Sequence, residues 1–155
     1  MENLKVIDLG ARRRVVLVTT AAVTLGIDIA SKIWASAALA DHGKRIGPIK
    51  LRLVHNHGVV FGIGNNLPAT AITVLTASIA TVVALAAWRG AIRPPIAAGL
   101  IVGGAVANVA DRLTAGSVID FISIGRWPIF NLADVVLLIG IALLIFRNAP
   151  ENNIT

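Results

Sequence analysis

The chain has 155 residues, of which 56% are apolar and 14% are charged, and its mean hydropathy is +0.81. This combination excludes an ordinary soluble domain and a disordered chain, and it predicts an integral membrane protein. Fourteen Lys and Arg against eight Asp and Glu give a net charge of +6, which here points to phospholipid headgroups and not to nucleic acid. The absence of cysteine excludes disulfides, thiolate metal sites and cysteine nucleophiles.

Four apolar stretches approach the ~20 residues that a helix needs to cross a bilayer. We expect transmembrane helices over residues 15–40, 68–88, 94–112 and 130–146. The third stretch opens with Pro94-Pro95, which suits the first turn of a helix. Four spans occupy about half of the chain, so residues 1–155 are expected to form one membrane domain of the α-helical class.

The first stretch is also similar to a cleavable secretory signal, because three arginines precede it and Ala38-Leu39-Ala40 resembles a cleavage site. Asp28 and Lys32 interrupt the apolar run before that point, and three further spans follow. We therefore expect a retained first helix. Loss of the first 40 residues in an intact-mass measurement would contradict this expectation.

Lys and Arg near the span ends indicate how the chain is oriented. With four spans, the side of the termini holds seven basic residues: Lys5, Arg12, Arg13, Arg14, Arg89, Arg93 and Arg147. The other side holds five: Lys44, Arg45, Lys50, Arg52 and Arg126. The bias is small, but the triple arginine directly before the first span favours cytoplasmic termini, so residues 41–67 and 113–129 are expected outside.

The two outer segments carry strand patterns. Residues 49–53 alternate apolar and basic side chains, which is the period of a half-buried strand. Residues 117–124 are rich in β-branched side chains. We expect a small extracytoplasmic β-sheet, a cradle, at the outer membrane surface.

Half of the eight acidic residues fall within or beside apolar segments: Asp28, Asp111, Asp120 and Asp134. An ionised carboxylate at the centre of a membrane helix costs about 2.5–3.5 kcal/mol on insertion scales. In the expected orientation all four lie toward the outer half of the membrane, so they are candidates for one shared site.

Structural explanations compete with a functional one at three places. Asp28 and Lys32 are four residues apart and can form an ion pair within one helix. Asn131 and Asp134 resemble a capping box, with Asn131 as the N-cap. Asn108 and Arg112 can form a hydrogen bond at a helix end, and Asp111 can simply lie in water.

Asp120 has the weakest structural explanation, because the predicted strand carries it among apolar neighbours. Gly99 and Gly103, followed by Gly104, Ala105 and Ala107, form a face of small residues that favours close helix packing. His55 and His57 could share one face of a strand, but no third ligand accompanies them in this segment, so solvated histidines are favoured over a zinc site.

Taken in order, these motifs resemble those of lipoprotein signal peptidase, the prokaryotic type II signal peptidase, an aspartyl protease with four membrane helices. The motifs are Asp28-Ile-Ala-Ser-Lys32, Asn56-His-Gly58-Val-Val-Phe61, Gly103-Gly104-Ala-Val-Ala107-Asn108-Val-Ala-Asp111-Arg112, Val118-Ile-Asp120-Phe121 and Phe130-Asn131-Leu-Ala133-Asp134. Each motif alone is unspecific, but five in the family's order are a strong signal.

The resemblance implies a catalytic pair and residues around it. Asp120 and Asp134 would be catalytic. The substrate would be surrounded by Asn56, Gly58, Asn108, Arg112 and Asn131, and the site would be supported by Asp28, Lys32 and Asp111. No metal or other cofactor is implied. Ala107 replaces a motif glycine, and Val59-Val60 stands where the family often has alanines, so both add bulk beside the expected groove.

The resemblance also implies the substrate, a prolipoprotein signal peptide followed by a diacylglyceryl cysteine and cut on the amino side of that cysteine. We expect a monomer in the phospholipid of the cytoplasmic (inner) membrane, with the active site toward the extracytoplasmic side and no nucleic-acid partner.

The alternatives are a proton- or ion-coupled transporter or channel subunit, whose buried acids relay ions, and a non-catalytic membrane assembly factor. The tail, residues 148–155, is expected to be dispensable.

Overall fold

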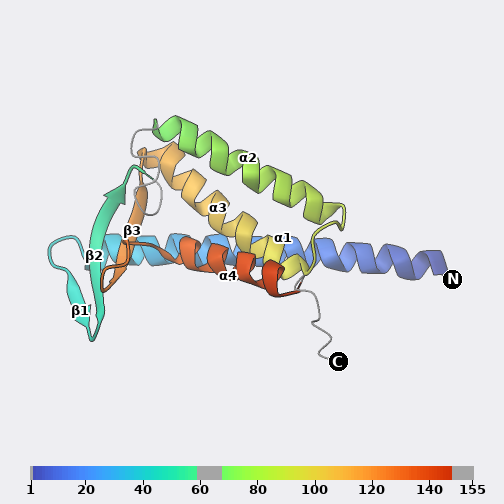
Figure 1. Cartoon of the computed structure of the whole chain (residues 1–155), viewed down its shortest axis with the longest axis horizontal. Coiled ribbons are helices and arrows are strands. Elements are labelled where there is room, and N and C mark those ends of the chain that lie inside the picture. The colour runs from blue at the N-terminus through green and yellow to red at the C-terminus, as the bar shows by residue number, and fades with distance from the viewer. Residues whose placement is uncertain (1, 59–67, 148–155) are drawn as a thin grey trace, which may run out of the picture.

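The computed structural model describes residues 2–58 and 68–147 (Figure 1). Within these residues the chain forms four α-helices and three β-strands. In chain order they are α1 (Glu2–Ala38), β1 (Lys44–Ile46), β2 (Ile49–Asn56), α2 (Ala69–Trp88), α3 (Pro95–Ala115), β3 (Val118–Ile124) and α4 (Leu132–Arg147). The sheet lies at one end of the helices, and the N-terminal part of α1 extends from the other end (Figure 1).

Three helices are long and apolar enough to cross a membrane by length and composition, namely Leu9–Ala38 within α1, α2 and α3. The first helix begins at Glu2, earlier than expected, because charged residues before the apolar run are compatible with a helix. The fourth expected span is shorter than predicted. At 16 residues, α4 extends about 24 Å, which is less than a hydrocarbon core of about 30 Å.

The late start of α4 is caused by a contact outside the helix. The N–H of Phe130 donates to the carbonyl of Ile122 at 3.0 Å, and the N–H of Ile122 donates back at 2.9 Å. This isolated bridge to β3 holds Phe130 in an extended conformation, so the helix begins at Leu132 and not at residue 130.

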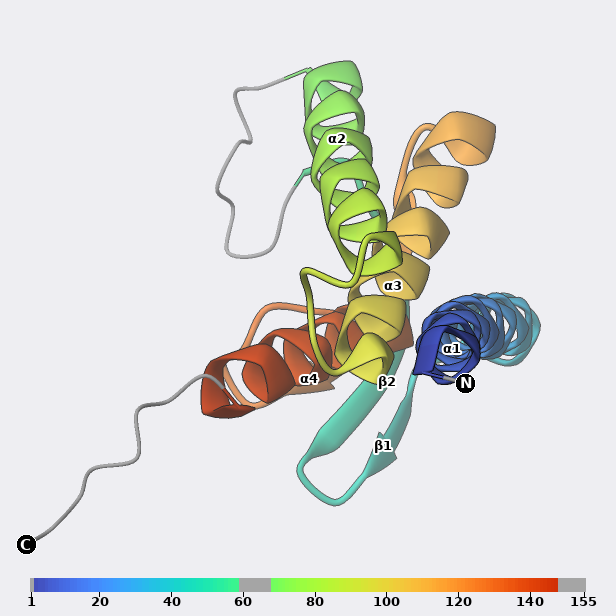
Figure 2. The ribbon, with the colours of Figure 1, turned by 90° about the vertical axis from the view of Figure 1, so that its right-hand side faces the viewer.

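Helix α3 is the centre of the bundle, and α1, α2 and α4 each pack against it (Figure 2). A Cβ added to Gly103 would lie 2.7 Å from the carbonyl oxygen of Ala21 in α1, and one added to Gly104 would lie 2.6 Å from that of Ala133 in α4. The predicted role of the small residues in close helix packing is therefore confirmed. By contrast, α2 and α4 do not pack against each other anywhere in the described part of the chain.

The sheet is antiparallel with the order β1-β2-β3. The two predicted strands are confirmed, although β2 continues to Asn56, and β1 was not predicted. Phe121 of β3 packs with Ala35 and Leu39 at the end of α1, and its ring meets that of Trp34 edge-on at 6.3 Å. Since successive side chains of a strand point to opposite faces, this packing directs the neighbouring Asp120 to the other face.

Candidate active site

Asp120 lies in the middle of β3 and is only 1% exposed. Its Oδ2 accepts a hydrogen bond of 2.8 Å from Nδ2 of Asn56, which ends the neighbouring strand β2. Its Oδ1 accepts one of 2.8 Å from Nδ2 of Asn131, directly before α4. The sheet register and the start of α4 therefore fix both oxygens of this carboxylate.

Asp134 lies in the first turn of α4 and forms the predicted capping box with Asn131. The N–H of Asp134 donates to Oδ1 of Asn131 at 3.0 Å, and the N–H of Asn131 donates to Oδ2 of Asp134 at 3.3 Å. The other oxygen of Asp134, Oδ1, accepts a hydrogen bond of 2.9 Å from Nδ2 of Asn108 in α3. The capping box is thus confirmed, and it leaves the carboxylate facing a further polar partner.

Asn131 connects the two acids. It is completely buried, its side chain donates to Asp120, and its backbone N–H donates to Asp134. Both acids also line one cavity of about 690 Å³. The remaining residues of its lining are Asn56, Ile72, Thr76, Ala105, Asn108, Arg112, Val118, Trp127, Phe130, Val135, Leu137, Leu138 and Ile139. The two acids predicted to be catalytic therefore meet at one place.

The environment of Asp120 favours its protonated form. Burial is the largest cause, and it raises the pKa of the Asp120 carboxyl from 3.8 to about 6. The negative charge of Asp134 raises this pKa further, whereas the hydrogen bonds from Asn56 and Asn131 lower it. A carboxyl group with such a pKa can hold or release a proton near neutral pH.

Lys32 joins the supporting residues into one network. Its Nζ lies 2.5 Å from Oδ2 of Asp28 and 2.8 Å from Oδ2 of Asp111, and it donates to Oδ1 of Asn108 at 3.2 Å. The intrahelical pair with Asp28 is therefore confirmed, but Lys32 also connects α1 with α3. Asp28 in turn accepts a hydrogen bond of 2.8 Å from the N–H of Ala133.

Asp111 does not simply lie in water, so that alternative was wrong. It is 19% exposed, pairs with Lys32, and accepts a hydrogen bond of 3.3 Å from the N–H of Ile119 at the start of β3. The predicted bond between Asn108 and Arg112 is present in a backbone form, with Nη1 of Arg112 donating to the carbonyl of Asn108 at 3.4 Å.

Arg112 reaches across to the end of β2. Its Nη2 donates to the carbonyl of Gly58 at 2.9 Å, while the N–H of Gly58 donates to Oδ1 of Asn56 at 2.9 Å. The Nε of Arg112 is buried and has no hydrogen-bond partner within the described part of the chain. Arg112 also lines the cavity. Val59-Val60 and Phe61 of the same motif lie outside the described residues.

The apolar lining of the cavity was missed by sequence reasoning. Ile72 and Thr76 of α2, and Leu137 and Leu138 of α4, read only as parts of membrane spans. The one usable signal was Trp127, because tryptophan in a loop beside a span is typical of the membrane interface.

Metal-ligating side chains do not cluster in the described ranges 2–58 and 68–147, where no group of three His, Cys, Asp or Glu could hold an ion. His57 instead has Nδ1 at 3.3 Å from the carbonyl oxygen of Gly116. The polar groups that line the cavity are carboxylates, amides and a guanidinium.

Comparisons with known proteins point to one family. The family model described as Signal peptidase (SPase) II matches residues 20–149. The protein named Lipoprotein signal peptidase from Caulobacter vibrioides is 38% identical over 149 residues, covering 87% of this chain and 88% of the relative. Its namesake from Aquifex aeolicus is 38% identical over 130 residues, covering 78% of each chain.

A solved structure with a similar fold is a bacterial membrane enzyme determined by the in meso method, with a TM-score of 0.73 and 25% sequence identity. The match covers 90% of this chain and 94% of that one. The family model, the curated relatives and the shared fold all span most of the chain. This chain belongs to the signal peptidase II family.

Proposed function

We propose that this chain is an intramembrane aspartyl endopeptidase that removes the signal peptide from diacylglyceryl-modified prolipoproteins, with Asp120 and Asp134 as its catalytic pair. Membership of the signal peptidase II family supports cleavage of lipoprotein signal peptides. The observation that carries the assignment of the pair is that Asn131 donates hydrogen bonds to both acids at the wall of one cavity. The comparisons give no support to a transporter.

The chemistry follows from the shared proton of the pair. Two carboxyl groups in a buried site cannot both ionise easily, so one keeps a proton. The ionised member takes a proton from water as the water oxygen attacks the scissile carbonyl, and the protonated member donates to the carbonyl oxygen. When the C–N bond of the tetrahedral intermediate breaks, the leaving amine receives a proton and the pair returns to its initial state. The raised pKa of Asp120 supports this assignment.

Arg112 is the residue best suited to bind the substrate. It lines the cavity, and its guanidinium already binds one backbone carbonyl, that of Gly58, so it is suited to bind a carbonyl of the substrate peptide as well. Asn56 and Gly58 border the same region through their own hydrogen bond. Asn108 and Asn131 already use their side-chain amides within the network. We therefore assign these two residues to positioning the pair more than to contacting substrate.

The route of the substrate follows from the separation of α2 and α4. These helices do not pack against each other in the described part of the chain, and the cavity between them is lined by Ile72, Thr76, Leu137 and Leu138. An apolar signal-peptide helix can enter such an opening from the bilayer, since it leaves one apolar environment for another. The signal peptide would then extend along α4 with its carboxyl end at the acids.

The membrane arrangement belongs to the same proposal. Three membrane-length helices and the family indicate an integral membrane protein. We assign both termini to the cytoplasm on the basis of the triple arginine before the first span. The sheet and the acids, which lie at the opposite end of α1, would then face the extracytoplasmic side (Figure 1). The proposal includes a monomer in phospholipid.

The decisive experiment is cleavage of a diacylglyceryl-modified precursor by the purified protein in detergent. Asp120→Asn and Asp134→Asn preserve side-chain size but remove the shared proton chemistry, so we expect no released signal peptide from either variant. Asp41→Asn, which changes an exposed acid before β1, is the matched control and should retain full activity. Circular dichroism and thermal unfolding verify that all three variants fold.

Either of two results would overturn the proposal. Near-normal turnover by one of the two aspartate variants would remove that residue from the pair. Failure of the unmodified protein to cleave the precursor across a range of pH and detergents would argue against the peptidase activity itself.

A further inference from the structure

A group of arginines lies at the end of the bundle opposite the sheet. Arg14 of α1 places its guanidinium over the ring of Trp88, 4.9 Å from the ring centroid. Nη1 of Arg13 lies 3.7 Å from the position that a Cβ on Gly90 would occupy. Arg89 follows α2 directly and is exposed. Arginines from α1 thus meet the connection between α2 and α3, and we call Arg13, Arg14 and Arg89 the arginine rim.

An apolar groove of about 330 Å³ begins at this rim and runs between α1 and α2, with α3 as its floor. Its lining consists of Leu17, Val18, Ala21, Ala22, Leu25, Ala84, Trp88, Val102, Gly103 and Val106. Every one of these residues is apolar, so the groove suits hydrocarbon. Trp88 belongs to both features, since it lines the groove and also carries Arg14 on its ring.

The rim lies at the level where phosphates of a bilayer are expected. Helix α2 has 20 residues, which span about 30 Å, close to the thickness of a hydrocarbon core. Trp88 ends this helix and Arg89 follows, which is the order typical of a membrane interface. The groove therefore lies beside lipid tails, and the rim beside lipid headgroups.

We propose that the groove and the rim together bind one anionic phospholipid. One acyl chain lies in the groove between α1 and α2, and the phosphate is held by Arg13, Arg14 and Arg89. Charge complementarity identifies the headgroup, because three arginines gather at one end of the groove and guanidinium groups match phosphate oxygens in geometry. The proposal does not depend on the peptidase activity. The rim lies at the other end of the helices from the sheet that carries Asp120 (Figure 1), and the groove shares no lining residue with the cavity of the two acids.

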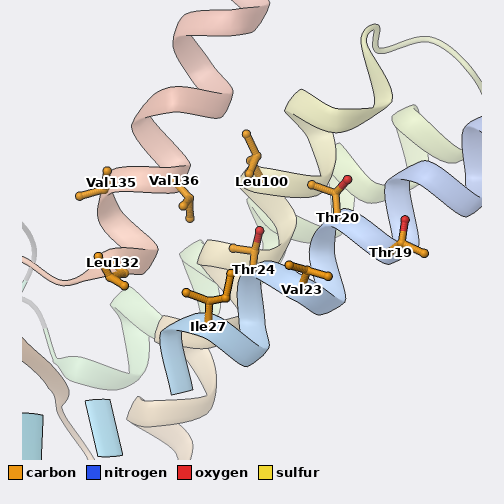
Figure 3. Close-up of a pocket in the computed structure, with 9 residues that line it drawn as sticks. All are labelled: Thr19, Thr20, Val23, Thr24, Ile27, Leu100, Leu132, Val135 and Val136. Carbon is orange, nitrogen blue, oxygen red and sulfur yellow. The ribbon is translucent and has the colours of Figure 1, made fainter. Parts of the chain in front are cut away.

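A second groove, which lacks the arginines, offers a comparison for this site. It has a volume of about 380 Å³ and lies between α1 and α4, with Leu100 of α3 behind it (Figure 3). Val23 and Ile27 line it from α1, and Val136 lines it from α4. No basic residue belongs to this lining. Our proposal requires both an apolar groove and the arginine rim. The second groove has no arginines, so it serves as an internal control.

The test is thermal unfolding and native mass spectrometry of the purified protein with added phosphatidylglycerol or phosphatidylcholine of equal chain length. Phosphatidylglycerol should bind more tightly and raise Tm more, because a ligand of the folded state stabilises it. Each arginine near a membrane surface contributes about fivefold in affinity. The double variant Arg13→Gln/Arg14→Gln should therefore lose about 25-fold in affinity for phosphatidylglycerol. It should lose less for phosphatidylcholine, because the choline cation offsets the phosphate charge that the arginines bind.

Matched variants separate this site from general attraction of charge. Arg147→Gln removes a cation at the same end of the molecule but outside the groove, and it should keep the preference for phosphatidylglycerol. Ala84→Phe fills the groove without changing charge and should weaken lipid binding. Val23→Phe fills the second groove and should leave binding unchanged.

Three results would overturn the proposal. The first is equal binding of the two lipids by the unmodified protein. The second is an equal loss for Arg147→Gln and for the double variant, which would indicate diffuse electrostatics. The third is full replacement of the lipid by inorganic phosphate, which would leave no role for the groove. Because neither readout uses cleavage, failure of this proposal is distinguishable from failure of the peptidase proposal.

Discussion

The hydrogen bond from Asn56 to Asp120 is expected to set the pH at which the catalytic pair loses its shared proton. The bond is 2.8 Å long and reaches a carboxylate that is 1% exposed. It stabilises the ionised form, so its removal must raise the pKa of Asp120. A hydrogen bond to a charged group contributes about 1.5–3 kcal/mol, which corresponds to about 1–2 pH units.

The variant Asn56→Ala tests this expectation through the pH dependence of kcat/KM, which reports the ionisation of the free enzyme. In the unmodified protein, kcat/KM should decrease above about pH 6, by about tenfold for each further pH unit, as the pair loses its last proton. In Asn56→Ala the same decrease should begin about 1–2 pH units higher. The maximum rate should also be lower, because the N–H of Gly58 loses its acceptor.

Histidine is the side chain that most often titrates in this pH range, so a histidine variant is the appropriate control. His55→Gln changes the residue beside Asn56 on β2, at an exposed position. Its pH profile should match that of the unmodified protein. The reasoning is refuted if the decrease begins at the same pH in Asn56→Ala, or if His55→Gln shifts it by as much.

Three further predictions concern stability, each measured by unfolding in detergent. Lys32→Met leaves the carboxylates of Asp28 and Asp111 without their cation and should lower the free energy of unfolding by about 3–5 kcal/mol. A loss below about 0.5 kcal/mol would show that these ion pairs do not stabilise the fold. Gly104→Ala places a Cβ 2.6 Å from the carbonyl oxygen of Ala133 and should cost about 1–3 kcal/mol, whereas unchanged Tm would show that α4 can move aside. The pKa of Asp120 is higher in the folded protein than in the unfolded chain, so the folded protein binds this proton more tightly. The free energy of unfolding should therefore fall by about 3 kcal/mol as the pH rises from about 4 to about 6. The variant Asp120→Asn should not show this decrease in stability. If the variant still shows it, the decrease is due to another titrating group.

Local sequence signals were sufficient for the elements whose limits are set locally. Helix α3 begins at Pro95, one residue after the expected start. It ends at Ala115, three residues past the expected end at residue 112, because Gly116, with a φ of 70°, is the local signal that terminates it. The alternation of residues 49–53 identified β2. Strand β1 has three residues and all are exposed, so it carries no pattern of burial that periodicity could reveal.

Elements whose limits depend on contacts outside the element were predicted less well. The start of α4 was placed too early because Phe130 pairs with Ile122 of β3, and the apolar pattern of the span does not show this pairing. The apolar wall of the cavity was missed for a similar reason. Leu137 and Leu138 have the same local pattern as lipid-facing residues, and only the separation of α2 from α4 distinguishes them.

The site itself shows that a structural and a functional explanation of one residue need not compete. Asp134 caps α4 through Asn131, and the same two hydrogen bonds fix its carboxylate at the cavity. The carboxylate of Asp28 accepts a hydrogen bond from the N–H of Ala133, the residue before Asp134, so α1 stabilises the same turn of α4. Since a misplacement of about 1 Å can cost about a hundredfold in rate, the cap is a means of placing the acid. Asn131 is uncharged and fully buried, yet its loss should disturb both acids at once.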